Sequence, residues 1–273
     1  MHAEKRTIGF YVLAVFFTIF VLFLYGPLSA VFILSFQGPR GGLTFPLNGV
    51  SFHWFANLFE RQAVGDFGAS FARSFMLGLM VMVSTVVVAL LAGLAFRRKF
   101  IGATPLFYLT IASLVVPSII VSLGIGVLYQ QIGFRPAWFI SAFGAHLTWT
   151  LPFGVLIMFA VFNRFSTAYE EAARDLGASS WQTFYHVVLP MIAPSLIGVG
   201  LFGFSLSYDE FARTLLTSGS SNTLPLEIYG MTTNVTTPVL YALGTVTTLF
   251  SFLIILLTLG IILFIGRRRA RII

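Results

Sequence analysis

Long uncharged, apolar runs alternate with short charged clusters along this chain. Six runs without Asp, Glu, Lys or Arg are longer than the roughly 20 residues that a helix needs to cross about 30 Å of hydrocarbon. Within lipid, a single segment satisfies its own backbone hydrogen bonds as a helix. The pattern therefore predicts an all-α integral membrane fold. We expect its six transmembrane helices near residues 9–36, 73–96, 104–129, 137–162, 190–209 and 240–265.

The composition agrees with lipid as the main solvent. Of the 273 residues, 58% are hydrophobic and 9% are charged, whereas an average globular domain carries about 25% charged residues. The sequence has no cysteine, which excludes disulfides, thiolate metal sites and a cysteine nucleophile. The 16 basic residues outnumber the 9 acidic ones but occur in short clusters between apolar runs. This distribution argues against a nucleic-acid partner.

The basic residues also indicate how the predicted helices are oriented. An even number of spans places both termini on the same side as the loops that follow the second and fourth helices. That side holds eleven of the basic residues, and the other side holds five. By the positive-inside rule, we expect a multi-pass protein with both termini in the cytoplasm.

One loop on the predicted outer side, residues 37–72, carries a group of aromatic residues. These residues suit an interfacial amphipathic helix at 51–60, which includes Trp54 and Phe55. Such aromatics either form an ordinary belt at headgroup level or provide a docking surface for an external partner. Both interpretations stay open.

The longest inner connection, residues 163–190, has the sequence of a short helical hairpin. Gly177, in its middle, can adopt the left-handed conformation that ends a helix, and we expect Pro190 to end the second helix. The residues alone leave two equal alternatives: the hairpin inserts into a groove on another protein, or it lies on the membrane surface. Two capping-box spacings mark the helix starts, at Thr167 with Glu170 and at Ser179 with Gln182.

The hairpin also carries a spaced motif, which is Glu171-Ala172-Ala173, three residues, Gly177, nine residues, Val187, one residue and Leu189-Pro190. This spacing resembles the EAA loop of the membrane subunits of bacterial ABC importers, with valine in place of isoleucine. The resemblance implies a single permease domain over 1–273, a type I (MetI-like) bundle in the bacterial inner membrane, and a coupling helix that docks on an ATP-binding subunit. The coupling residues that it implies are Glu170, Glu171, Ala172, Ala173, Asp175, Leu176 and Gly177.

A second region of resemblance begins at the end of the fifth predicted helix. Its parts are Ser207-Tyr208-Asp209-Glu210, then Thr217-Ser218-Gly219, then Thr223-Leu224-Pro225-Leu226. This order resembles the spermidine/putrescine permease group, which usually has phenylalanine at the Tyr208 position. Importers of iron(III), thiamine and opines have similar layouts, so these solutes remain alternatives. The implied sites are a solute path or gate at Tyr208, Asp209 and Glu210, and a docking surface for a binding protein at Trp54, Phe55, Leu224 and Pro225.

The acidic pair has a second interpretation from geometry. Asp209 and Glu210 lie 19 and 20 residues beyond Pro190, which is about 28 to 30 Å along a straight helix. Near that outer end they can form a surface salt bridge, with Arg213 four positions after Asp209. The pair is therefore either a gate for a cationic solute or part of an ordinary surface.

Two other classes of function fit the sequence less well. An ion-coupled secondary transporter would place ionisable residues at the midplane of both halves, but the first four predicted helices hold no acidic residue. An intramembrane enzyme would need a metal-ligand or Ser–His arrangement. His146, the only histidine within a predicted span, is expected to be hydrogen-bonded in the bundle. We therefore expect a permease subunit that is not an enzyme.

Such a permease requires other subunits. The sequence has no Gly-x4-Gly-Lys-Ser/Thr phosphate loop. We therefore expect this chain to bind no cofactor, with ATP and Mg²⁺ held by two partner ATP-binding subunits. Six helices with one coupling loop supply half of a pathway, so the resemblance implies a second permease subunit, similar but not identical. It also implies an external solute-binding protein.

Overall fold

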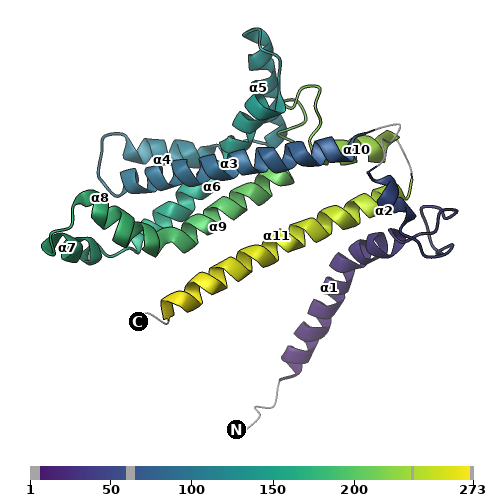
Figure 1. The fold of residues 1–273 in the computed structure, drawn as a ribbon, viewed down its shortest axis with the longest axis horizontal. Helices are drawn as coiled ribbons and strands as arrows, with labels where there is room; N and C mark the ends of the chain where they lie inside the picture. Colours follow the sequence, from purple (N-terminus) through teal and green to yellow (C-terminus); the bar gives the residue numbers. More distant parts are fainter. Residues whose placement is uncertain (1–6, 60–64, 235–236, 271–273) are drawn as a thin grey trace. The chain divides into compact units, whose positions relative to one another are not determined.

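The computed structural model describes residues 7–59, 65–234 and 237–270. The chain falls into two compact units, Met1–Asp66 with Gly230–Ser251 and Phe67–Tyr229 with Phe252–Ile273. Both units are helical (Figure 1). In chain order the helices are α1 (Ile8–Leu34), α2 (His53–Asn57), α3 (Phe67–Phe96), α4 (Ala103–Ala112), α5 (Ser118–Gln131), η1 (Trp138–Ala142), α6 (Phe143–Asn163), α7 (Ala168–Asp175), α8 (Ser180–Thr183), η2 (Phe184–Val188), α9 (Leu189–Tyr208), α10 (Leu224–Asn234) and α11 (Val239–Ala270).

Within the described ranges, five helical segments are long and apolar enough to cross a membrane. They correspond to the first, second, fourth, fifth and sixth predicted spans, so the expected count of six long helices is wrong. These segments are Ile8–Leu34, Phe67–Phe96, Trp138–Asn163, Ser180–Tyr208 and Val239–Ile261.

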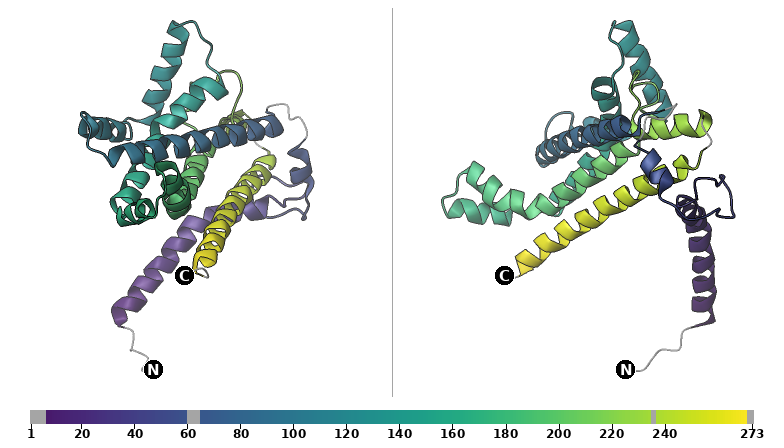
Figure 2. Two further views of the ribbon diagram at one scale, coloured as in Figure 1. Left: turned by 60° about the vertical axis from the view of Figure 1, so that its left-hand side comes forward. Right: turned by 45° about the vertical axis from the view of Figure 1, so that its right-hand side comes forward.

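The predicted third span, 104–129, is two shorter helices, α4 and α5, and this corrects the expectation of one continuous helix. The break occurs before Pro117, which lacks a backbone N–H and disfavours helical angles at the preceding residue. The hydroxyl of Ser113 donates to the Thr148 carbonyl of α6 at 2.8 Å. This hydrogen bond holds the segment between α4 and α5 against α6. Beyond it, α5 leaves the direction of α3, α6 and α9 at a steep angle (Figure 2).

The second helix of the hairpin does not end at Pro190, so that prediction is wrong. Instead α8, η2 and α9 form one continuous helix, Ser180–Tyr208. A proline removes one helical hydrogen bond, and its ring clashes with the carbonyl four residues earlier. The π-helical turn η2 widens the helix just before Pro190 and accommodates the ring. The second helix of the hairpin is therefore continuous with the helix of the fifth span.

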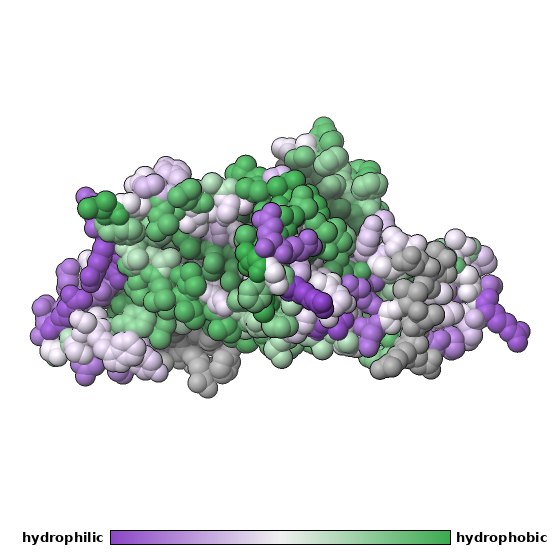
Figure 3. Space-filling model, turned by 90° about the horizontal axis from the view of Figure 1, so that it is seen from above, coloured by the Kyte–Doolittle hydropathy of each residue, from purple (hydrophilic) through white to green (hydrophobic). Residues whose placement is uncertain are grey.

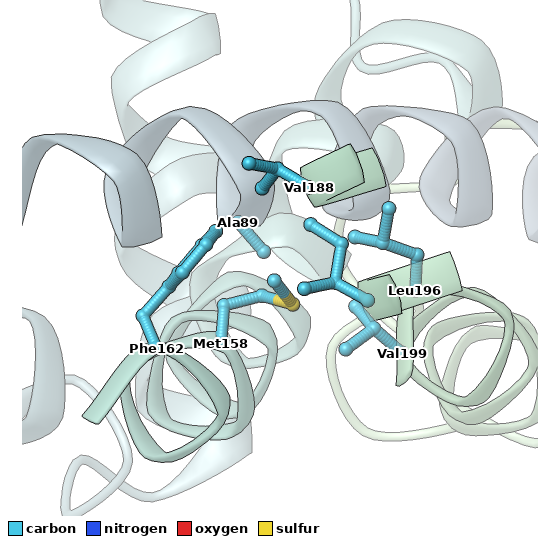
Figure 4. Close-up of a cluster of buried hydrophobic side chains, with 7 residues drawn as sticks. Ala89, Met158, Phe162, Val188, Leu196 and Val199 are labelled. Atoms are coloured by element: carbon cyan, nitrogen blue, oxygen red, sulfur yellow. The ribbon is translucent and has the colours of Figure 1, made fainter. Parts of the chain in front are cut away.

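The core of the second unit lies where α3, α6 and α9 meet (Figure 4). Gly93 of α3 allows the helices to approach closely, because a Cβ there would lie 2.9 Å from Met158 and from Phe162. Burial of each large apolar side chain contributes about 1.5–3 kcal/mol. The buried cluster consists of Ala89, Met158, Phe162, Val188, Ile192, Leu196 and Val199.

The first unit contains α1, the loop that leads to α2, and the beginning of α11. The buried side chain of Gln37 organises this loop, because its Oε1 accepts a hydrogen bond from the Asn48 N–H at 2.7 Å. The helix predicted at 51–60 is shorter in the structure, where α2 covers five residues. Residue 60 lies outside the described residues.

Candidate functional site

The hairpin turns at Gly177, and its predicted left-handed conformation is confirmed by a φ of +86°. The Ala178 N–H donates to the Ala173 carbonyl at 3.0 Å, and the Gly177 N–H donates to the Arg174 carbonyl at 2.8 Å. These two bonds form a Schellman motif, which satisfies the last carbonyls of a helix. Glycine therefore ends α7 and reverses the chain at no Cβ penalty.

The two predicted capping boxes have different outcomes. Ser179 accepts a hydrogen bond from the Gln182 N–H, and the Gln182 side chain accepts one from the Ser179 N–H, so this box is confirmed. Thr167 has helical backbone angles and makes no side-chain cap, so the first box is wrong. Glu170 instead forms a hydrogen-bonded ion pair with Arg97, at the end of α3. The carboxylate of Glu170 is thus paired with Arg97, which is far away in the sequence, instead of capping the start of α7.

The hairpin leaves large apolar side chains exposed at its turn. Leu176 is 90% exposed and Trp181 is 71% exposed. Figure 3 shows that hydrophilic residues gather at this end of the second unit, beside a broad hydrophobic region. Exposed apolar residues at a polar end are typical of a surface that contacts another protein. Of the remaining motif residues, those exposed are Glu171, Ala172 and Asp175, and Ala173 is half-buried.

A second charged group lies beyond the other end of α9, before α10. Nη1 of Arg213 lies 3.6 Å from Oε2 of Glu210, and both side chains are buried. The Arg213 N–H also donates to Oε1 of Glu210 at 2.8 Å. The predicted surface salt bridge between Asp209 and Arg213 is therefore wrong in its partner and in its exposure.

Aromatic and hydroxyl groups from two helices surround the Arg213 guanidinium. Its Cζ lies 4.7 Å from the centroid of the Trp149 ring, a cation–π geometry. Its Nε donates to Oγ1 of Thr148 at 3.2 Å, and its Nη1 donates to Oγ of Ser118. Burial lowers the pKa of Arg213 and the Glu210 carboxylate raises it, so the guanidinium stays charged.

The three residues predicted for the solute path have different surroundings. Asp209 follows the last residue of α9, is exposed, and makes no ion pair within the described ranges. Tyr208 is buried, and its ring packs against Phe204 and Phe71. Glu210 is held by its arginine. Of these three residues, Asp209 is therefore the one whose charged side chain is exposed.

His146 is hydrogen-bonded inside the bundle, as predicted. Its Nδ1 lies 2.8 Å from Oγ of Ser207, and its Nε2 lies 2.9 Å from Oγ1 of Thr214. Since these partners belong to α9 and to the segment that carries Arg213, the imidazole joins α6 to both. His146 therefore helps to hold the residues before and after Asp209 in place.

The residues predicted to dock an external protein are not equally accessible. Leu224 is buried at the start of α10, and its N–H donates to Oγ of Ser74 at 2.8 Å. Pro225 is half-buried, as are Trp54 and Phe55 in the first unit. Leu224 thus belongs to the packing of the second unit rather than to its surface.

The sequence analysis missed two partners, Arg97 and Trp149. It counted Arg97 only as one of the eleven basic residues on the predicted inner side, and it did not consider Trp149. Their contacts join residues that are 73 and 64 positions apart. Local spacing carries no signal for such pairs. In the described part of the chain, no group of three or more His, Asp or Glu could hold a metal ion.

These features define a multi-pass helical membrane protein with an exposed hairpin joined to one of its spans. Residues 85–271 match the family described as binding-protein-dependent transport system inner membrane component. The match covers more than half of the sequence, and the chain belongs to this family. It is a permease of a binding-protein-dependent ABC importer, a transport component rather than a catalytic subunit.

Named relatives cover most of the chain. One is the spermidine/putrescine transport system permease protein PotC of Haemophilus influenzae, 26% identical over 91% of this chain and 95% of the relative. Another is the PotC protein of Escherichia coli strain K12, 25% identical over 88% of this chain and 90% of the relative. The putrescine transport system permease protein PotI of the same strain is 26% identical over 82% of this chain and 80% of the relative.

Two solved structures have a similar fold. A bacterial ABC transporter involved in the import of the acidic polysaccharide alginate matches with a TM-score of 0.66 at 17% identity, over 98% of each chain. The MetNI methionine ABC transporter, in an inward-facing conformation, matches with a TM-score of 0.56 at 17% identity, over 73% of this chain and 94% of the other. At these identities the likeness concerns the fold alone.

Proposed function

We propose that this permease imports a small organic cation of the polyamine class, such as spermidine or putrescine. The observation that carries the proposal is the exposed carboxylate of Asp209 at the end of α9, beside a Glu210–Arg213 pair whose charges cancel. An uncompensated negative charge near the mouth of a pathway raises the local concentration of a cation. The names of the relatives favour the same solute class.

The coupling function belongs to the hairpin in this proposal. Helix α7 inserts into a cleft of a partner ATP-binding subunit, with Leu176 as an apolar contact at its exposed end. Because α8, η2 and α9 are one continuous helix, a displacement of the hairpin is transmitted to α9. Asp209 lies at the far end of that helix, so closure of the ATP-binding subunits can change the outer site.

The remaining subunits and the orientation follow from this scheme. A second, similar permease completes the pathway, and α1, which is apolar all round, packs against it or against lipid. The external binding protein docks through the outer loops that carry Trp54, Phe55 and Pro225. The ATP-binding subunits hold ATP and Mg²⁺. The hairpin and the segment before α10 lie at opposite ends of α3. Arg97, just after the last residue of α3, pairs with Glu170, and Arg73, near its first residue, donates to the Asn222 carbonyl at 2.6 Å. In this proposal the two ends therefore lie on opposite sides of the membrane.

Competitive uptake tests the solute class. The complete transporter is expressed in bacteria that lack their own polyamine uptake, and labelled spermidine and putrescine are offered with unlabelled thiamine, an opine or iron(III) as competitors. The proposal predicts saturable polyamine uptake that these competitors do not reduce. Uptake of thiamine, an opine or iron(III) with no polyamine uptake would overturn the proposed solute and leave the permease function in place.

A further inference from the structure

A cavity of about 570 Å³ lies between the end of α3, helix α7 and the start of the α8–α9 helix. One part of its wall is apolar and includes Leu94, Phe184 and Val188. Its polar lining residues include Arg97, Arg98, Arg174, Glu170 and Thr183. The motif and the proposed transport function do not account for this cavity.

The cavity lining carries an excess of positive charge. It holds three guanidinium groups but a single carboxylate, that of Glu170. Arg97 pairs with this carboxylate, while Nη2 of Arg174 remains 4.0 Å from it. Arg98 has no ion pair among the residues that the structure describes. One acidic group cannot neutralise three basic ones, so the site has capacity for an anion.

One residue of the cavity lining also carries a buried hydroxyl group. Thr183 lines the cavity and is 2% exposed, and its Oγ1 has no hydrogen-bond partner in the structure. A buried polar atom without a partner costs about 1–3 kcal/mol, and most such atoms in native proteins are satisfied.

We propose that this cavity binds a phosphate group. Guanidinium groups bind phosphate through paired, charge-assisted hydrogen bonds. The surroundings suit the headgroup level of the inner leaflet, because Trp181 and Tyr185 are exposed nearby on the hairpin and Ile101 follows the basic cluster. The phosphate therefore comes from an anionic phospholipid or from a soluble phosphate compound. The bound phosphate group contacts Arg97 and Arg174, which also lie next to the Glu170 carboxylate. Phosphate binding therefore changes the strength of the contact between α7 and the end of α3.

Binding of lipid and of free phosphate can be measured on the complete purified transporter. The cavity variant is Arg98→Gln with Arg174→Gln, which leaves the Arg97–Glu170 pair intact. The matched control is Lys99→Gln with Arg164→Gln, which removes two basic charges on the same side, outside the cavity lining. In one arm, native mass spectrometry counts phosphatidylglycerol and phosphatidylcholine retained from mixed nanodiscs. In the other arm, calorimetry measures inorganic phosphate binding in detergent without phospholipid.

The proposal predicts that the wild type and the control bind phosphate in at least one arm. It predicts that the cavity variant binds about 30-fold more weakly, which corresponds to about 1 kcal/mol for the hydrogen bond that each of the two guanidinium groups loses. Retention of phosphatidylglycerol over phosphatidylcholine identifies the lipid as the source, and binding in the calorimetric arm alone identifies a soluble compound. Equal binding by the cavity variant and the control, or no binding by the wild type in either arm, would overturn the proposal.

Discussion

The second unit has an arginine–glutamate pair near each end of its bundle, and the two pairs differ in burial. The side chains of Arg97 and Glu170, beside the hairpin, are 20% and 15% exposed, whereas those of Arg213 and Glu210 are 2% and 7% exposed. A partly exposed ion pair contributes about 1 kcal/mol or less. Removal of one partner from a buried pair costs roughly 3–5 kcal/mol, because the other charge is left uncompensated.

This difference suits the two roles that we propose. A pair that is inexpensive to break can release and rejoin α7 when a partner subunit moves. A pair that is costly to break holds the segment after α9 in place, which keeps Asp209 exposed and Glu210 neutralised. Ion pairs of the same composition can therefore serve as a reversible contact at one end and as a rigid support at the other.

The largest expected effect is the difference in labelling between the two ends of the second unit, which we place on opposite sides of the membrane. Because the chain has no cysteine, single cysteines can be introduced as Ala178→Cys in the hairpin and Ser220→Cys beyond α9. We expect a membrane-impermeant thiol reagent to label position 220 in intact cells, and position 178 only after the membrane is permeabilised. The reverse pattern would mean that the orientation is wrong.

Breaking the buried pair should have the next largest effect. Arg213→Met leaves Glu210 buried and unpaired, so we expect stability to fall by roughly 3–5 kcal/mol, measured as thermal unfolding of the purified complex. The double variant Arg213→Met with Glu210→Gln removes both charges and should recover most of that loss. If the double variant is as unstable as the single one, the two groups do not act as a pair.

Gly177→Val tests the turn of the hairpin. A β-branched residue at φ +86° costs more than the roughly 1–2 kcal/mol of a left-handed L-residue, so α7 should be displaced while the core of α3, α6 and α9 stays folded. We expect loss of copurification of the ATP-binding subunit and of uptake, with normal insertion. Gly177→Asn is the matched control, because asparagine tolerates this conformation. Normal uptake by the valine variant would remove the hairpin from coupling.

Asp209→Asn should affect transport but not assembly. The amide has a similar shape without the charge that attracts a cation, so we expect a roughly three- to tenfold increase in KM for spermidine at an unchanged Tm of the complex. Asp209→Glu retains the charge and should stay close to the wild type. An unchanged KM in the asparagine variant would make Asp209 an ordinary surface residue.

Arg97→Gln should have the smallest effect on stability, about 1 kcal/mol or less, because the pair that it breaks is partly exposed. Thermal unfolding beside the Arg213→Met variant compares the two pairs directly. Equal losses in the two variants would contradict the difference that burial predicts.

Sequence reasoning succeeded where the signal was local. The positions of five long spans followed from apolar runs, and the Gly177 turn and the Ser179 cap followed from residue types at fixed spacing. It failed at Pro117 and Pro190, where the same residue type ends one helix and, behind a π-helical turn, continues another. The partners of Glu170 and Glu210 could not be predicted, because Arg97 is distant in the sequence and because burial decides which of Asp209 and Glu210 meets Arg213.

The central claim is ATP-driven import of a polyamine through this permease. The most direct measurement uses proteoliposomes that contain the complete transporter, with ATP on the side of the ATP-binding subunits and labelled spermidine with the binding protein on the other side. We predict that spermidine accumulates in the ATP compartment, and that the spermidine-loaded binding protein increases ATP hydrolysis above the rate with the empty one. Spermidine movement without ATP, or hydrolysis that does not respond to the loaded binding protein, would contradict the account.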